Sequence, residues 1–326
     1  MNILVTGGAG YIGSIVAEQL LLREHRVIVI DNLQEGNRAA VLPEAAFYEA
    51  DFGDTEVLGE IFQKHDIDVV FHFAGEATIE FSMTDPGKYF KNNLVKGITL
   101  LDVMREYDCD KFIFSSTAAT FGEPEYTPID EKHPQKPINA YGESKLMFEG
   151  VLEWYHRAYG LKFNAFRYFN ASGASERFGE AHKRESHLIP LIIQAALGQR
   201  EQIYIFGTDY PTKDGTCVRD YIHVLDLAEA HILGLDNLER HPNGRYNLGN
   251  GEGFSVREVI EMVAEVSERD FPKVEAERRP GDPATLIASS ELAKEELGWK
   301  PKYDSLKEIV RTAWEWHRSH VDGYDN

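Results

Sequence analysis

The first 31 residues combine a short apolar run, a glycine-rich turn, a helical stretch and a second apolar run. Residues 2–6 form the first run and residues 7–13 form the turn. The second run covers residues 26–30 and ends at Asp31. This order within one short unit predicts a dinucleotide-binding βαβ motif at the start of a parallel α/β sheet.

The turn has the residue types that a bound pyrophosphate requires. Gly7 and Gly10 let the backbone approach the phosphates, and the following helix directs free N–H groups at them. Gly13 permits close packing of the helix on the strand. The Asp31 carboxylate is positioned to accept hydrogen bonds from a ribose diol and would repel a 2′-phosphate, so the sequence favours NAD over NADP.

Further apolar runs alternate with helical stretches along the chain. The predicted strands cover 46–50, 68–73, 111–114 and 162–169, and the clearest helices cover 93–106 and 141–158. Buried strands alternating with helices predict a doubly wound parallel sheet (Rossmann fold). We expect an NAD-binding domain over 1–170 and a smaller, mainly substrate-binding C-terminal domain over 171–326, with some later segments rejoining the sheet.

Composition narrows the choice of partners. The chain has 326 residues and a net charge of −20, which opposes binding to nucleic acid or to an anionic membrane surface. No apolar run approaches the ~20 residues of a membrane span. The two cysteines, Cys109 and Cys217, match no metal-ligand spacing and fit a reducing compartment. We therefore expect a cytoplasmic protein without a metal site.

Tyr141 and Lys145 are four residues apart at the start of a predicted helix, so both side chains lie on one face. A phenol is a weak base at neutral pH, but a nearby ammonium group favours the phenolate and lowers the phenol pKa. Thr117, at the end of the preceding strand, can offer a hydroxyl to the same oxygen. The pair predicts proton transfer coupled to hydride transfer between NAD and an alcohol.

With these motifs the chain resembles the extended short-chain dehydrogenase/reductase family and, within it, the UDP-glucose (UDP-galactose) 4-epimerases. The resemblance covers essentially the whole chain. The matching segments are 6–14, 31–33, 72–75, 114–118, 141–145, 167–170, 206–210, 214–224 and 246–249.

The resemblance implies a tightly held NAD and reversible oxidation of a UDP-hexose at C4, with Tyr141 and Lys145 as catalytic residues alongside Thr117. The implied NAD-binding residues are Gly7, Gly10, Tyr11, Ile12, Gly13, Asp31, Asn32, Asp51, Phe52, Phe73, Ala74, Gly75, Asn92, Ser115, Tyr141, Lys145 and Phe169. The implied substrate-binding residues are Thr117, Tyr141, Asn170, His187, Leu188, Tyr204, Phe206, Arg219, Tyr221, Arg279, Asp282 and Leu286.

An acidic protein that binds a diphosphate needs a local positive pocket. Arg219 and Arg279 can supply it with forked donors, although for each arginine an ordinary ion pair, for example with Asp220 or Asp282, is the alternative.

Other functions on this fold are less compatible with the sequence. Nucleotide-sugar 4,6-dehydratases place an Asp-Glu pair where this chain has Ala118-Ala119, which cannot transfer protons. A non-enzymatic NAD-binding regulator would often lack the Tyr/Lys pair. A 4-epimerase of UDP-glucuronate or of a UDP-pentose remains open.

Two further expectations follow from the resemblance. Leu286 stands where some members carry a tyrosine, and the smaller side chain leaves room for an N-acetyl group, so we expect some activity on UDP-N-acetylhexosamines. Helices 93–106 and 141–158 are expected to pair with their copies in a homodimer. The loop 76–81 departs locally from the family pattern.

Overall fold

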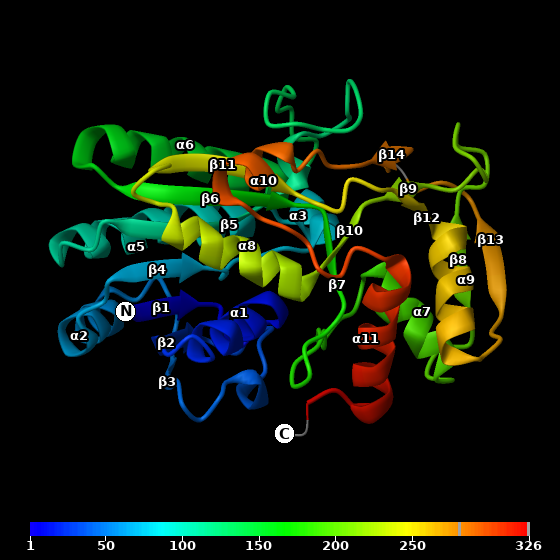
Figure 1. The fold of residues 1–326 in the computed structure, drawn as a ribbon, viewed down its shortest axis with the longest axis horizontal. Coiled ribbons are helices and arrows are strands. Elements are labelled where there is room, and N and C mark those ends of the chain that lie inside the picture. Colours follow the sequence, from blue (N-terminus) through cyan, green and yellow to red (C-terminus); the bar gives the residue numbers. More distant parts are fainter. Residues whose placement is uncertain (280–281, 325–326) are drawn as a thin grey trace.

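The computed structural model describes residues 1–279 and 282–324, and a seven-stranded parallel sheet lies at its centre (Figure 1). The strand order is β11-β6-β5-β4-β1-β2-β3. The strands are β1 (Asn2–Thr6), β2 (Arg26–Asp31), β3 (Ala46–Glu49), β4 (Val69–His72), β5 (Lys111–Thr117), β6 (Lys162–Tyr168) and β11 (Asn243–Leu248). The predicted doubly wound parallel sheet is confirmed.

The central strands are apolar along their length because helices cover both faces. β4 is buried at every position, and β1 at every position after Asn2. On one face the core includes residues of α1 (Tyr11–Leu21), α8 (Val224–Asp236) and α10 (Glu291–Leu297). On the other face it includes residues of α2 (Thr55–His65), α5 (Lys96–Glu106) and α6 (Ala140–Tyr159).

The sheet takes in segments from the second half of the chain. β11 pairs in parallel with β6, from Asn243 opposite Phe163 to Leu248 opposite Tyr168. α8 contributes Leu227, Ala228 and Ala230 to the same core as α1. Segments of the second half of the chain are therefore part of the central sheet and of its core.

A second group of elements lies at the end of the molecule away from the N-terminus (Figure 1). Its core is made by α7 (Leu188–Ala196), α9 (Val256–Ser267) and α11 (Leu306–Ser319), with β8 (Ile203–Phe206) paired to β13 (Lys273–Ala276). A capping box between Ser255 and Glu258 starts α9.

Small sheets join the two parts. β7 (Asn170–Ser172) pairs with β10 (Tyr221–His223), and β9 (Val218–Arg219) lies between β12 (Phe254–Ser255) and β14 (Thr285–Leu286). The remaining elements are η1 (Arg38–Ala40), α3 (Ile79–Thr84), α4 (Pro86–Tyr89), the π-helical turn η2 (Phe90–Val95) and η3 (Ala118–Thr120). Within the described ranges, no helix is long and apolar enough to cross a membrane.

Candidate active site

The glycine turn between β1 and α1 is packed too tightly to accept side chains. Gly7 has a φ of +71°, and a Cβ there would lie 2.6 Å from the Ala74 backbone nitrogen. A Cβ on Gly13 would lie 2.2 Å from the Gly7 carbonyl oxygen. Gly10 precedes α1 as its N-cap and provides no side-chain cap, so the first N–H groups of the helix are open to a ligand. The turn fits a dinucleotide pyrophosphate.

Asp31 ends β2 beside this turn. Its two carboxylate oxygens accept hydrogen bonds from the backbone N–H groups of Ala9, at 3.0 Å, and Leu33, at 2.9 Å. Burial raises the pKa of the Asp31 carboxyl, and these two hydrogen bonds oppose that shift. Each oxygen retains a lone pair for a ribose hydroxyl, so the geometry fits the predicted role.

The end of β4 approaches the turn from the other side. Phe73 and Ala74 follow β4 directly, and Gly75 has a φ of +146°, where a Cβ would lie 2.8 Å from Asn93 Oδ1. The Asn93 side chain accepts a hydrogen bond from the Glu76 N–H, at 2.8 Å, and donates to the Glu76 carbonyl and to Ser144 Oγ. Asn93 thereby fixes the loop after β4 to helix α6.

The unusual loop that begins at Glu76 is held by charge. The Glu76 carboxylate lies 2.9 Å from Lys88 Nζ and accepts hydrogen bonds from Asn92, at 3.0 Å, and Gln34, at 3.1 Å. Asn92 is one of the predicted cofactor residues, and here its amide supports this loop.

Tyr141 lies in the first turn of α6, where Asn139 caps the helix by accepting a hydrogen bond from the Gly142 N–H at 2.8 Å. Burial raises the pKa of the Tyr141 phenol, and the nearby Thr117 hydroxyl opposes that rise. Thr117, at the end of β5, therefore lies beside the phenol, and its catalytic role stays a prediction.

Lys145 lies one helical turn further on and is 4% exposed. Its Nζ donates a hydrogen bond to the Ser115 carbonyl at 3.0 Å and lies 4.9 Å from the Phe114 ring centre. Burial lowers the pKa of Lys145 to about 8, against the opposing effect of the Glu149 charge. An ammonium with this pKa is still mostly charged at neutral pH and can favour the phenolate form of Tyr141.

A buried ionic network below the pair was missed by the sequence analysis. The Glu149 carboxylate lies 2.5 Å from Arg167 and accepts a hydrogen bond from Ser116 at 2.5 Å. Glu149 and Arg167 are both 2% exposed. The signal was present as the regular spacing of Tyr141, Lys145 and Glu149, which places all three on one face of α6.

The predicted substrate residues gather around β9 and the end of β6. Asn170, in β7, donates from its amide to the Asp220 carbonyl at 2.8 Å. Arg219 lies in register with Leu286 across the β9–β14 pair and forms an ion pair with Asp282. The Arg219 side chain is 13% exposed. The ion-pair alternative is thus realised with Asp282, and it holds the guanidinium in place.

Several of the other predicted substrate residues are aromatic. The Arg279 guanidinium lies 4.0 Å from the centre of the Phe206 ring, and Tyr204 lies 5.9 Å from the same ring, centre to centre. Tyr221 is buried in β10, and Leu188 is the first residue of α7.

The other predicted residues lie as follows. Tyr11 and Ile12 open α1, and the Tyr11 hydroxyl donates to the Gly173 carbonyl at 2.6 Å. Asp51 forms an ion pair with Lys96 at 2.5 Å, and Phe52 is buried against His72. Asn32 follows β2, and Phe169 lies between β6 and β7.

His187, a predicted substrate residue, has carboxylates as its neighbours. Its Nδ1 lies 2.7 Å from Glu180 and 3.1 Å from Glu185, so its imidazole is engaged by two carboxylates. Its role toward a substrate stays a prediction.

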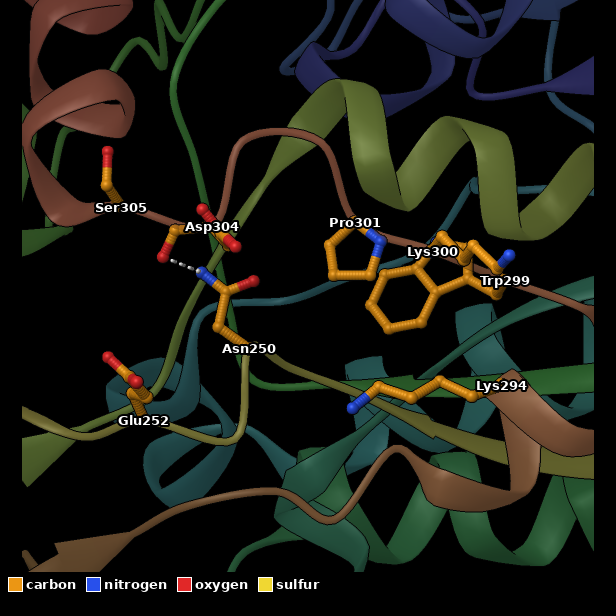
Figure 2. A pocket seen from close by; sticks show the side chains of 8 residues that line it. All are labelled: Asn250, Glu252, Lys294, Trp299, Lys300, Pro301, Asp304 and Ser305. Carbon is orange, nitrogen blue, oxygen red and sulfur yellow. Dashed lines mark hydrogen bonds between the residues drawn. The ribbon is translucent and has the colours of Figure 1, made fainter.

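A pocket of about 580 Å³ is lined by residues outside the predicted site, one of which, Asn250, donates a hydrogen bond to the Tyr221 carbonyl at 2.7 Å (Figure 2). Figure 2 shows Pro301 beside the Trp299 ring, and the Asn250 amide bonded to the Asp304 carbonyl at 3.4 Å. None of the eight lining residues is a predicted site residue, so this pocket carries no part of the site.

Comparison with known proteins agrees with this geometry. The profile of the "NAD dependent epimerase/dehydratase family" matches residues 3–249. A UDP-glucose 4-epimerase of Halalkalibacterium halodurans is 52% identical over 99% of this chain and 98% of its own length.

Solved structures give the same picture. One titled as a UDP-glucose 4-epimerase superposes with a TM-score of 0.97 at 48% identity and covers 100% of both chains. The Bifidobacterium longum UDP-glucose 4-epimerase, in complex with NAD⁺ and UDP, is 35% identical with a TM-score of 0.95, covering 99% of this chain and 100% of its own.

Proposed function

The chain belongs to the NAD dependent epimerase/dehydratase family, and from that premise we propose that it interconverts UDP-galactose and UDP-glucose. The observation that carries this proposal is the convergence of Thr117, Tyr141 and Lys145 beside a complete dinucleotide turn. The full-length similarity to UDP-glucose 4-epimerases supports the choice of substrate.

The cofactor is NAD, whose binding would fall to the glycine turn, Asp31 and the ends of β3 and β4. When bound, NAD would supply the acceptor and the donor of the hydride that is exchanged with the sugar C4. The protein's own contribution is proton transfer and positioning.

Tyr141 acts on the hydroxyl at C4. Its phenolate takes the hydroxyl proton as C4 is oxidised and returns it when C4 is reduced, so no proton is gained or lost over the cycle. Lys145 stabilises the phenolate by its charge, and the Thr117 hydroxyl stabilises it by donating a hydrogen bond to the Tyr141 oxygen. The buried Glu149 carboxylate favours the charged form of Lys145.

The substrate diphosphate is assigned to Arg219 and Arg279. Arg219 is oriented by Asp282, and Arg279 lies over the Phe206 ring, so both guanidinium groups are held before a ligand arrives. Forked donors of this kind suit phosphate oxygens within an otherwise acidic protein.

Proton NMR of UDP-galactose incubated with the purified protein, without added NAD, tests the proposal. We expect the anomeric signal of UDP-glucose to grow, because the protein retains its cofactor. No conversion even after NAD is added would overturn the function. Faster turnover of UDP-glucuronate or UDP-xylose than of UDP-galactose would assign the chain to another sugar.

N-acetylated sugars are a second substrate class that Leu286 favours. The residue is half-buried beside Arg219 and lacks the bulk of a tyrosine. We expect measurable epimerisation of UDP-GlcNAc, reduced about tenfold or more in Leu286→Tyr while UDP-glucose turnover changes less. Absence of UDP-GlcNAc turnover where UDP-glucose reacts well contradicts this expectation.

The assembly is proposed to be a homodimer through α5 and α6, in a reducing cytoplasm. Met147 and Trp154 are 43% and 67% exposed and lie seven residues apart on α6, and Val95, next to α5, is 55% exposed. The proposal of a reducing compartment is supported by Cys109 and Cys217, which are both buried and form no disulfide.

A further inference from the structure

Four metal-ligating side chains converge in the segment before α7. Glu180, His182, Glu185 and His187 each offer one ligand atom, and these atoms all lie within 4.8 Å of one another. We call this group the Glu/His cluster. None of its members belongs to the Tyr141–Lys145 pair or to the glycine turn.

The separations within the Glu/His cluster match those of ligands around one ion. His187 Nδ1 lies 2.7 Å from Glu180 Oε1 and 3.1 Å from Glu185 Oε1. His182 Nδ1 lies 3.2 Å from Glu180 Oε1 and 3.6 Å from Glu185 Oε2. Four ligands at about 2.0–2.1 Å from a tetrahedral zinc ion are about 3.3 Å apart, in the middle of this range.

Hydrogen bonds within the cluster account for only part of the arrangement. His187 Nδ1 is hydrogen-bonded to Glu185 Oε1 at 3.1 Å, whereas Glu180 Oε1 and His182 Nδ1 have no hydrogen-bond partner among the described residues. The Glu180 side chain is 5% exposed, so water does not readily satisfy that oxygen. A buried carboxylate oxygen that lies 2.7 Å and 3.2 Å from two imidazole nitrogens is placed as a metal ligand would be.

The ligand types select the class of ion. Two imidazoles and two carboxylates suit a divalent transition metal such as Zn²⁺, whereas Mg²⁺ and Ca²⁺ prefer oxygen ligands alone. Two carboxylates also neutralise the charge of a divalent ion. Glu185 Oε1 accepts hydrogen bonds from the backbone N–H groups of Ser186 and His187, both at 2.7 Å, which orients it as outer-shell contacts orient metal ligands.

The position of the Glu/His cluster indicates what the ion would do. The same segment contacts the loop that follows β2 and Asp31, where Lys183 Nζ donates to the carbonyls of Leu33, at 2.9 Å, and Gln34, at 2.8 Å. Asn37 donates to the Ala181 carbonyl at 3.1 Å. These contacts are made by residues that alternate with the ligands, so fixing the ligands fixes the contacts.

We propose that Glu180, His182, Glu185 and His187 form a structural site for one zinc-class divalent cation that fastens residues 180–187 over the NAD-binding loop. We assign the ion a structural role only, with no part in proton or hydride transfer. This proposal differs from our expectation that the chain has no metal site. That expectation was based on the two cysteines, which match no metal-ligand spacing.

Metal analysis of the whole protein tests the site. Protein stripped with a chelator is reloaded with Zn²⁺ alone, dialysed and measured by inductively coupled plasma mass spectrometry. We expect one zinc per chain in the wild type and at least tenfold less in Glu180→Gln and His182→Ala. His241→Ala is the matched control, because His241 lies 3.3 Å from a single carboxylate, Glu296, outside the Glu/His cluster. It should keep the zinc.

Cobalt gives an independent readout of ligand geometry. Co²⁺ added to stripped wild-type protein should produce the strong visible bands of a tetrahedral site, and these should be absent in His182→Ala. A wild type that retains no zinc and gives no such bands overturns the proposal. So does full zinc retention by the Glu180→Gln/His182→Ala double variant.

Wild-type protein alone also decides the matter if the variants do not fold. Chelation should lower Tm and speed NAD release, and Zn²⁺ but not Mg²⁺ should reverse both changes. Unchanged Tm and unchanged NAD release after chelation contradict the structural role. Since these readouts need no substrate, they stand whether or not the proposed epimerase activity is found.

Discussion

At the reacting residue, one oxygen atom separates Tyr141 from a phenylalanine. Tyr141→Phe keeps the ring in its place near Tyr89, 6.5 Å away between ring centres, and removes the proton-accepting group. We expect kcat for UDP-galactose to fall about 10²–10⁴-fold, the usual contribution of a general base. Initial rates measure the fall, and absorbance of the retained cofactor checks that NAD still binds. Near-normal turnover would exclude Tyr141 as the base.

Lys145 pairs a catalytic benefit with a cost in stability. Its native pKa, about 8, lies below the value of ~10.4 expected in the unfolded chain. Burying the ammonium therefore destabilises the fold at neutral pH. Lys145→Met should raise the unfolding free energy of the NAD-free protein at pH 7 by about 1–3 kcal/mol, while turnover falls at least a hundredfold.

The sign of the pH dependence provides the check on Lys145. Between pH 8 and pH 10 the unfolded wild-type chain binds more protons than the native one, so wild-type stability rises with pH. Lys145→Met has no ammonium at this position, so the excess of its unfolding free energy over that of the wild type should shrink between pH 8 and pH 10. Urea unfolding at several pH values measures it. A methionine variant less stable than wild type at pH 7 would contradict the assigned cost.

At the scale of elements, the β1–α1 turn depends on close approach of backbone to backbone. Gly13→Ala would place a methyl group 2.2 Å from the Gly7 carbonyl oxygen and force the turn apart. We expect at least tenfold weaker NAD retention after gel filtration, together with a lower Tm. Gly87→Ala is the matched control, because it lies exposed in α4 and its Cβ would meet only Asp85, at 3.8 Å. Equal NAD retention by both variants would show that the turn tolerates a side chain.

Elements with a local signature could be predicted from the sequence. The βα units were recognisable because apolar runs, glycine turns and Asp31 follow one another along the chain. The pairing of β11 with β6 could not be placed, since residues 243–248 join a strand about 80 residues earlier in the chain. The ion pair of Glu149 with Arg167 could not be placed either, because it depends on how helix α6 packs on strand β6.

The Glu/His cluster could not be predicted from the sequence for a different reason. Its four residues lie on an irregular segment, where the spacing of 180, 182, 185 and 187 matches no regular helix face or strand face. The position of His187 in the family pattern predicts a contact with the substrate, and the sequence alone gives no sign of the carboxylates around it. Only the backbone path between β7 and α7 brings the two histidines and two glutamates together.

For the whole molecule, the exposed apolar side chains on α6 identify the face expected to meet a second copy. Trp154 is 67% exposed and Met147 is 43% exposed, and no described atom outside helix α6 lies within 4 Å of a Cβ placed on Gly150, which is between them. Large exposed aromatic residues are costly in water and typical of interface centres. Since helix α6 also carries Tyr141 and Lys145, dimerisation would support the catalytic helix from its outer side.

Trp154→Arg tests this face. A charged side chain at the centre of a helix pair should weaken the dimer by at least 2 kcal/mol, which is about thirtyfold or more in Kd. Sedimentation at micromolar concentration should then show a dimeric wild type and a substantially monomeric variant. Leu22→Arg provides the control, because Leu22 is 71% exposed just past the end of α1, outside α5 and α6. It should leave the dimer intact. A monomeric wild type, or a Trp154→Arg protein that stays dimeric at nanomolar concentration, would place the interface elsewhere or remove it.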